Sequence, residues 1–376
     1  MVTFQNVGED GMKRRDFAIG LSAAVAASPL IARGAASRLD WPTAATRGDI
    51  ATVGAAWTRA TSGALPALGR GDALVIIQNG KLVFERYGAD HGPTTRHISW
   101  SMAKSITQAV VGAAVLEGKI DIEAPLKLVP HGDPKLNLRS LLNLTDGMTW
   151  DEADYDPAKS DATRMLFGEG RFDGAGYTAA KTQAFPPGTH WRYSTGAFQL
   201  AAAEVQARLF PSLHTADARR AAMAEWMDAR LFGPLGMTTA VPEFDAAGVF
   251  VGGSWVYASA RDYARFGELY RLDGVWKGRR LLPKGWVKFA RTPTVEPTYG
   301  AGFWLEAPAS AKPPSLMAGA GPLDAYSAQG HDGQIILIVP SKALVIVRLA
   351  LMDDGDAAWK ALGEWLTPVV KAFPDA

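Results

Sequence analysis

The sequence contains no cysteine, which excludes disulfides, thiolate metal ligands, a cysteine nucleophile and a lipid-anchored cysteine. It also lacks an excess of either charge, because 39 lysines and arginines face 38 aspartates and glutamates. A nucleic acid or an anionic membrane surface would require a basic patch, so neither is an expected partner. The 376 residues, 48% of them hydrophobic, suffice for one large domain or two closely packed subdomains.

Several motifs of catalysis are missing as well. The chain has no Gly-x-Ser-x-Gly elbow, no His-Glu-x-x-His pair and no phosphate-binding glycine loop. Five of the six histidines show no metal-ligand spacing: His91, His97, His131, His190 and His214. We therefore expect neither a metal nor a cofactor.

The N-terminus has the pattern of a secretory signal. Lys13-Arg14-Arg15-Asp16-Phe17 precedes an apolar stretch over 18–27, and small residues continue to Ala36. The Arg-Arg-x-Phe core resembles the twin-arginine type, so residues 1–36 are predicted to direct export, with a periplasmic destination. The apolar stretch is shorter than the roughly 20 residues that a membrane span needs, so no stable insertion is expected after signal removal. Translation from Met1 or Met12 fits equally well, and the sequence specifies no oligomeric state.

Two hairpins are predicted near the ends of the remaining chain. ALVIIQNGKLVFERYG has two β-prone runs joined by Asn79-Gly80, and QIILIVPSKALVIVRL has two joined at Pro340-Ser341. Helices are expected over 48–61, over 101–117 and from about 357, the last bent or split by Pro368. The predicted α+β domain over 37–376 has one antiparallel sheet and flanking helices from about 41–123 and 285–376, with a mostly helical insertion at about 124–284.

Ser101 stands three residues before Lys104, ahead of a long apolar run. On a helix the two side chains share one face, and the helix N-terminus supplies free N–H groups that stabilise negative charge. Burial would lower the lysine pKa enough for it to act as a base. A capping serine with an exposed lysine fits the same spacing, so both interpretations stay open on this motif alone.

Two later segments favour the catalytic interpretation. Tyr193 stands in PPGTHWRYSTGAFQLAAAEV, and His331-Asp332-Gly333 leads into a strand in SAQGHDGQIILIV. With Ser101-x-x-Lys104, this order resembles the serine hydrolases of the class C β-lactamase and penicillin-binding superfamily, including its esterase, D-peptidase and nylon-oligomer-hydrolase branches. The resemblance covers 74–349 and implies a β-lactamase/transpeptidase-like fold.

The resemblance also implies roles for individual residues. Ser101 would be the acyl-accepting nucleophile, and Lys104 and Tyr193 would share the proton transfers. The oxyanion hole would use the backbone N–H groups of Ser101 and Gln334. Gly333 would leave room for substrate beside the strand.

Substrate contacts are expected from four further residues. His331 would face the cleft where β-lactamases keep a lysine, and Thr195 stands where they keep an asparagine. Both departures argue against efficient β-lactam hydrolysis. Tyr155 and Trp255 are candidate pocket residues, although a solvated acidic loop and core packing explain them as well.

The sequence therefore predicts an exported serine hydrolase that acts on a small ester, an amide or a D-amino-acid peptide. A catalytically weak penicillin-binding-like sensor and an acyltransferase are the alternatives. A sensor would acylate once without release, and a transferase would favour an added acceptor over water.

Overall fold

The computed structural model describes residues 41–376, so the predicted signal peptide lies outside the described residues. Its helices are α1 (Ile50–Thr61), α2 (Met102–Leu116), α3 (Leu138–Leu142), α4 (Asp161–Phe167), α5 (Gly174–Ala179), α6 (Thr195–Leu209), α7 (Ala216–Met227), α8 (Gly233–Leu235), α9 (Ala260–Arg271), α10 (Trp286–Ala290) and α11 (Asp356–Lys371). Among residues 41–376, no helix combines the length and the apolar character that crossing a bilayer requires.

The strands form one main sheet and two small ones. The main sheet has the order β2-β1-β11-β10-β9-β8, and its neighbouring strands are antiparallel. The strand bounds are β1 (Arg70–Gln78), β2 (Lys81–Tyr87), β8 (Trp304–Leu305), β9 (Tyr326–Gly330), β10 (Gln334–Val339) and β11 (Leu344–Leu351). The small sheets pair β3 (His97–Ile98), β5 (Val256–Ala258) and β4 (Val241–Pro242), and β6 (Val275–Trp276) with β7 (Arg279–Arg280).

Both predicted hairpins are confirmed, and they meet in this sheet. Asn79 and Gly80 take φ angles of 52° and 73°, the left-handed conformations that a two-residue type I′ turn requires. Strand β1 then pairs with β11 of the second hairpin, which joins chain segments about 270 residues apart. The antiparallel sheet of the expected α+β fold is therefore built from the two ends of the domain.

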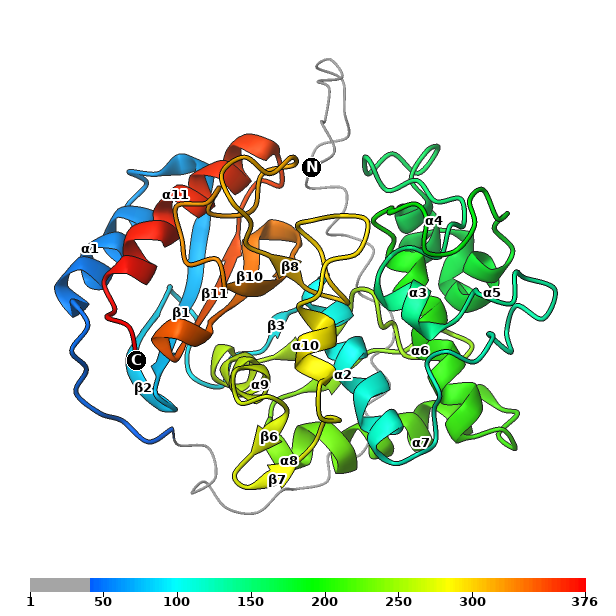
Figure 1. The fold of residues 1–376 in the computed structure, drawn as a ribbon. Helices are drawn as coiled ribbons and strands as arrows, with labels where there is room; N and C mark the ends of the chain where they lie inside the picture. The colour runs from blue at the N-terminus through cyan, green and yellow to red at the C-terminus, as the bar shows by residue number, and fades with distance from the viewer. Residues whose placement is uncertain (1–40) are drawn as a thin grey trace.

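Each face of the sheet buries its own hydrophobic core. Leu74 and Ile76 of β1 pack with α1 and α11 on one face, where Figure 1 shows these helices side by side. Val75 and Ile77 point to the opposite face and join the larger core of α2, α6 and α9. Helix α9 falls within 124–284, yet it packs directly on the sheet, so this part of the helical segment belongs to the sheet layers.

Helix α11 differs from the prediction at Pro368. It runs from Asp356 to Lys371 as one α-helix with Pro368 inside, rather than splitting there. Trp365 and Leu366 before the proline, and Val369 and Val370 after it, are all buried against the sheet. Packing on both sides of Pro368 therefore outweighs the loss of one helical hydrogen bond.

Candidate active site

Ser101 and Lys104 meet at the start of α2. Ser101 is the N-cap residue, but its side chain makes no capping hydrogen bond. Its Oγ lies 2.9 Å from Nζ of Lys104 instead. Trp100, just before it, has a φ of 45°, a strained conformation for a non-glycine residue of the kind that clusters at functional sites. The interpretation as a capping serine with an exposed lysine is therefore wrong.

Lys104 is enclosed by hydrogen-bond acceptors and has almost no solvent exposure. Besides Ser101, its Nζ donates to Oγ1 of Thr195 at 2.9 Å and to the carbonyl oxygen of Gly253 at 3.0 Å. Burial lowers the lysine pKa from 10.5 to about 8, against the opposing effect of the negative charge of Glu152. A neutral amine is therefore accessible within about one unit of pH 7, as a general base requires.

Tyr193 lies beside Lys104, two residues before the first residue of α6. Its ring stacks on Trp304 with centroids 5.6 Å apart, and Nζ of Lys104 lies 4.7 Å from the centre of the tyrosine ring. Burial, and next the charge of Glu152, raise the pKa of Tyr193 well above its usual range, although a hydrogen bond with Ser101 opposes the rise. The phenol therefore keeps its proton near neutral pH, while the lysine can lose one.

Thr195 serves the lysine rather than a substrate, which corrects the prediction. The side chain is buried, and its Oγ1 accepts from Lys104 while donating to Oε1 of Glu152 at 2.5 Å. Glu152 also accepts from the backbone N–H of Thr195 and from Nε1 of Trp150, both at 2.7 Å. The threonine hydroxyl has no capacity left for a substrate amide, because its only proton goes to Glu152.

The predicted second oxyanion donor, Gln334, is also wrong. His331–Gly333 form a 3-10 turn that links β9 to β10, and Gln334 is the first residue of β10, inside the sheet. Its backbone is paired with Gly330 of β9, and its side chain is bonded to Ala350 of β11. The strand beside Ser101 is instead β9, because a Cβ on Gly330 would lie 2.3 Å from the carbonyl oxygen of Ser99.

The hydrogen-bond pattern of β9 identifies another backbone N–H group as the second oxyanion donor in place of Gln334. The N–H of Glu306 donates to the carbonyl of Ala325, so the polar groups of Ala325 face the β8 side. Backbone N–H and C=O groups point to alternate sides along an antiparallel strand, so those of Gln329, four residues later, point to the same side as those of Ala325. Strand β8 pairs only with Tyr326 and Ser327, so the N–H of Gln329 faces the open sheet edge beyond β8. Since the N–H of Ser101 has no acceptor among residues 41–376 either, these two groups are the candidate oxyanion hole.

Gly333 has a different role from the one predicted. Its φ is 77°, and a Cβ there would lie 2.5 Å from Nη1 of Arg348 and 3.0 Å from the side chain of Met352. Arg348 and Met352 belong to the face of the sheet that carries α1 and α11. The turn needs glycine because of its backbone conformation and this packing.

The family of the chain follows from comparison with known proteins. The beta-lactamase family model matches residues 65–359, which include the whole constellation around Ser101. This chain belongs to the beta-lactamase family. This family belongs to the serine hydrolase superfamily, and the proteins that match this chain include enzymes named as hydrolases and a D-stereospecific amidohydrolase from Streptomyces.

Among the relatives of this beta-lactamase family chain is 6-aminohexanoate-dimer hydrolase from Paenarthrobacter ureafaciens. The two are 27% identical over 301 residues, which cover 77% of this chain and 75% of the relative. A structure from Bacillus anthracis, described as a candidate 6-aminohexanoate-dimer hydrolase, has a TM-score of 0.64 at 20% identity, with 81% of both chains covered. EstCE1, described as a hydrolase with promiscuous acyltransferase activity, has a TM-score of 0.62 at 15% identity, with 86% and 99% covered. These structures establish the β-lactamase/transpeptidase-like fold.

The structure brings His331 and Tyr155 together at the rim of the beta-lactamase-type site. The hydroxyl of Tyr155 donates to Oδ2 of Asp354 at 2.5 Å and lies 2.8 Å from Nδ1 of His331. The same carboxylate oxygen is 2.8 Å from Nδ1 of His331, whose ring packs edge-on against Trp100 at 5.2 Å. The loop that carries Tyr155 is therefore bonded to His331 and Asp354. His331 in turn contacts Trp100, the residue just before Ser101.

Trp255 lines a cavity whose lining includes none of Ser101, Lys104 and Tyr193. It lies two residues after Gly253, which holds the lysine, and its ring packs against Phe167 at 5.7 Å. The cavity has a volume of about 260 Å³. Its apolar walls are Met165, Leu166, Phe172, Phe244, Val251 and Trp255. Arg171, Gln199 and Asp245 also line the cavity, so its walls are mixed rather than wholly apolar.

Proposed function

We propose that this protein is a serine hydrolase that cleaves short linear esters or amides through an acyl-enzyme on Ser101. The observation that carries the proposal is the buried Lys104, with Nζ 2.9 Å from Oγ of Ser101 and a pKa lowered to about 8. A serine paired with a base that can be neutral near pH 7 is an activated nucleophile. We also propose that residues 1–36 direct export to the periplasm, since the twin-arginine pattern is followed by a short apolar stretch and small residues.

The proposed chemistry has two halves. Oγ of Ser101 attacks the substrate carbonyl carbon as its proton moves to neutral Lys104, and the oxygen anion is stabilised by the N–H groups of Ser101 and Gln329. The carbon–nitrogen or carbon–oxygen bond then breaks, and the leaving group takes a proton from the Tyr193 hydroxyl, which is replenished from Lys104. In the second half, water attacks the acyl ester with the same groups as base. The carboxylic acid leaves, and Oγ recovers its proton.

The substrate class is supported by the surroundings of Ser101. The residues beside the entrance are Tyr155 and His331, whose polar atoms are already bonded to each other and to Asp354, so no cationic side chain is offered to a substrate carboxylate there. Neither the lysine nor the asparagine amide that would hold a β-lactam is present, and Thr195 is fully occupied by Lys104 and Glu152. The relative named as acting on the 6-aminohexanoate dimer, a linear amide, makes such amides the first substrates to test.

The test combines covalent labelling with turnover. Mature wild-type protein and Ser101→Ala are treated with a fluorophosphonate probe, measured by intact mass and mapped by peptide digestion. We expect one adduct, on the Ser101 peptide, and none in the folded variant. A panel of p-nitrophenyl esters, linear ω-amino-acid amides, D-peptides and a β-lactam is then assayed on both proteins.

Each outcome of the panel has a defined meaning. Multiple turnover of a linear ester or amide that is lost in Ser101→Ala supports the proposal. Full turnover by folded Ser101→Ala contradicts it. Stoichiometric acylation without release would instead indicate a sensor, and preferential transfer to an added alcohol or amine would indicate an acyltransferase.

A further inference from the structure

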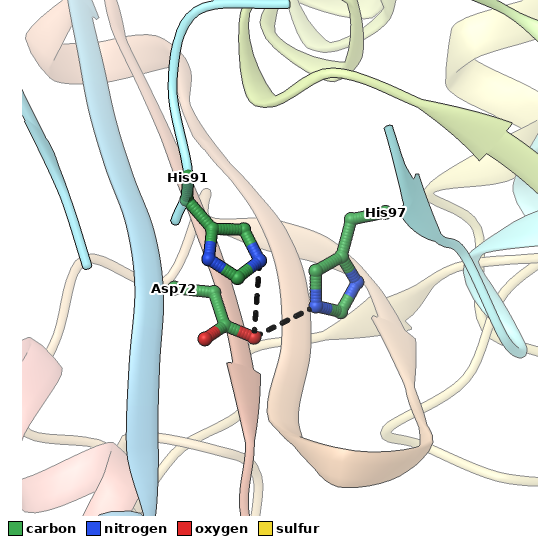
Figure 2. A group of neighbouring side chains, drawn as sticks. All are labelled: Asp72, His91 and His97. Atoms are coloured by element: carbon green, nitrogen blue, oxygen red, sulfur yellow. Dashed lines mark hydrogen bonds and ion pairs between the residues drawn. The ribbon is translucent and has the colours of Figure 1, made fainter. Parts of the chain in front are cut away.

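A second cluster of chemically competent side chains lies outside the active site. Asp72 of β1, His91 of the loop after β2 and His97 of β3 place one ligand atom each within 4.8 Å of one another. Figure 2 shows one carboxylate oxygen of Asp72 facing both imidazole rings. The sequence predicted no metal site, because His91 and His97 lack a recognised spacing and Asp72 lies on a strand almost 20 residues earlier.

The Nδ1 atom of each imidazole ring is held by a backbone carbonyl. Nδ1 of His91 lies 2.9 Å from the carbonyl oxygen of Ala89, and Nδ1 of His97 lies 3.2 Å from that of Ile98. A carbonyl accepts only, so a ring that donates from Nδ1 and is neutral presents a lone pair at Nε2; Nε2 of His97 also lies at hydrogen-bond distance from a carboxylate, which accepts only, so a proton or a cation must lie between them. This Nδ1–H···O=C arrangement is the one that orients histidines bound to a metal through Nε2.

Both Nε2 atoms face the same anionic oxygen. Oδ2 of Asp72 is 3.0 Å from Nε2 of His97 and 3.8 Å from Nε2 of His91. Lone pairs directed at a carboxylate repel it unless a proton or a cation lies between them. In a tetrahedral zinc site with bonds of about 2.0–2.1 Å, neighbouring ligand atoms are about 3.3 Å apart, and the two observed distances bracket this value.

The surroundings fit a partly enclosed cation. Asp72 is buried, and 18% and 12% of the His91 and His97 side chains are exposed, which leaves an open side for water ligands. Arg70 holds Oδ1 of Asp72 at 2.7 Å and reaches Oδ2 at 3.2 Å, so it orients the carboxylate from behind, as outer hydrogen bonds do at metal sites. Arg70 also brings a positive charge, which will weaken binding of a dication.

We propose that Asp72, His91 and His97 bind one divalent transition-metal cation of the Zn²⁺ type, completed by water. Two imidazoles and one carboxylate suit Zn²⁺ better than Mg²⁺ or Ca²⁺, which prefer oxygen ligands. His97 pairs β3 with β5 and lies four residues before Ser101. The cation would therefore fix the loop after β2 to β1 and hold the strand that leads into the nucleophile.

The test uses untagged protein treated with EDTA and then dialysed free of it. Zn²⁺ is titrated by calorimetry into wild type, His91→Ala and Asp72→Asn, and into His131→Ala, which removes an exposed histidine elsewhere. We expect one site in wild type and in His131→Ala, and at least tenfold weaker binding in the other two. At a hundredfold excess of free Zn²⁺ over Kd, the melting temperature of wild type should rise by about 4 °C.

The His91→Ala variant keeps the proposal falsifiable if Asp72→Asn does not fold, since His91 lies on a loop. Absence of a stoichiometric Zn²⁺ site in wild type would overturn the proposal, as would equal Kd values in wild type and folded His91→Ala. Equal affinity for Mg²⁺ and Zn²⁺ would overturn the assignment to a transition metal. None of these readouts depends on hydrolase activity, so failure of the cation site and failure of the proposed function are distinguishable.

Discussion

Replacing Glu152 by glutamine should move the acid limb of the activity profile to lower pH. In wild type, Lys104 must lose a proton to act as base, so log kcat/KM should rise with unit slope below about pH 8 and then level off. The negative charge of Glu152 raises the pKa of Lys104, against the larger effect of burial. Removing that charge leaves burial unopposed, and the lysine pKa falls further.

The size of the shift follows from the geometry. Oε1 of Glu152 and Nζ of Lys104 are hydrogen-bonded to the same Thr195 oxygen, at 2.5 and 2.9 Å, so they lie within about 5 Å of each other. A unit charge at that distance, with an effective dielectric constant of about 20–40, contributes roughly 2–3 kcal/mol. The midpoint should therefore move down by about 1–2 pH units in Glu152→Gln.

The assay measures kcat/KM from pH 5 to 9.5 with an ester whose leaving group needs no protonation. Asp156→Asn is the matched control, because it removes the same charge from an exposed position on the same loop. Folding of both variants is verified by circular dichroism. A midpoint that stays in place or moves upward in folded Glu152→Gln would refute the coupling of this carboxylate to the lysine.

Three further predictions concern the same site. Replacing Lys104 by methionine should abolish turnover and change the pH dependence of stability. Between pH 8 and 10.5 the unfolded lysine holds a proton that the folded one has lost, so in urea unfolding wild type should gain up to about 3 kcal/mol relative to the variant. Tyr193→Phe should lower kcat about 10²–10⁴-fold on amides and less on activated esters, because only the amine leaving group needs a proton; equal losses on both would argue against the relay. Gln329→Pro, which deletes the N–H, should lower kcat about 10²–10³-fold while Gln329→Ala does not; full activity in folded Gln329→Pro would contradict this assignment of the N–H group.

The sequence predicted those features that depend on neighbouring residues. Asn79-Gly80 specifies its turn through two left-handed residues, and Ser101 and Lys104 are one helical turn apart whatever surrounds them. Tyr193 was assigned through the resemblance to the class C β-lactamase superfamily, whose motifs follow in this order along the chain. Each of these assignments needs only local geometry and the order of motifs along the chain.

The features that were missed depend on how distant segments meet. Strand β9 reads YSAQG, which has no apolar alternation, so the strand beside Ser101 was assigned to the stronger apolar run that begins at Gln334. Glu152 reaches Thr195 across 43 residues, and within an acidic loop nothing distinguishes it from its solvated neighbours. The only available signal was indirect: a threonine in place of an amide needs another acceptor to hold its hydroxyl.

That acceptor explains how a buried lysine can be neutral and still be directed at Ser101. Glu152, when ionised, only accepts, so the hydroxyl of Thr195 must donate to it and accept from Lys104. The carbonyl of Gly253 also only accepts. Two of the three positions around Nζ must therefore be N–H groups, and when the third proton leaves, the lone pair has one direction left, toward the hydroxyl of Ser101. Deprotonation leaves no buried polar group without a partner, because Ser101 then donates where it accepted before. It follows that Glu152→Gln should lower the plateau of kcat as well as the midpoint, since an amide no longer forces the orientation of Thr195.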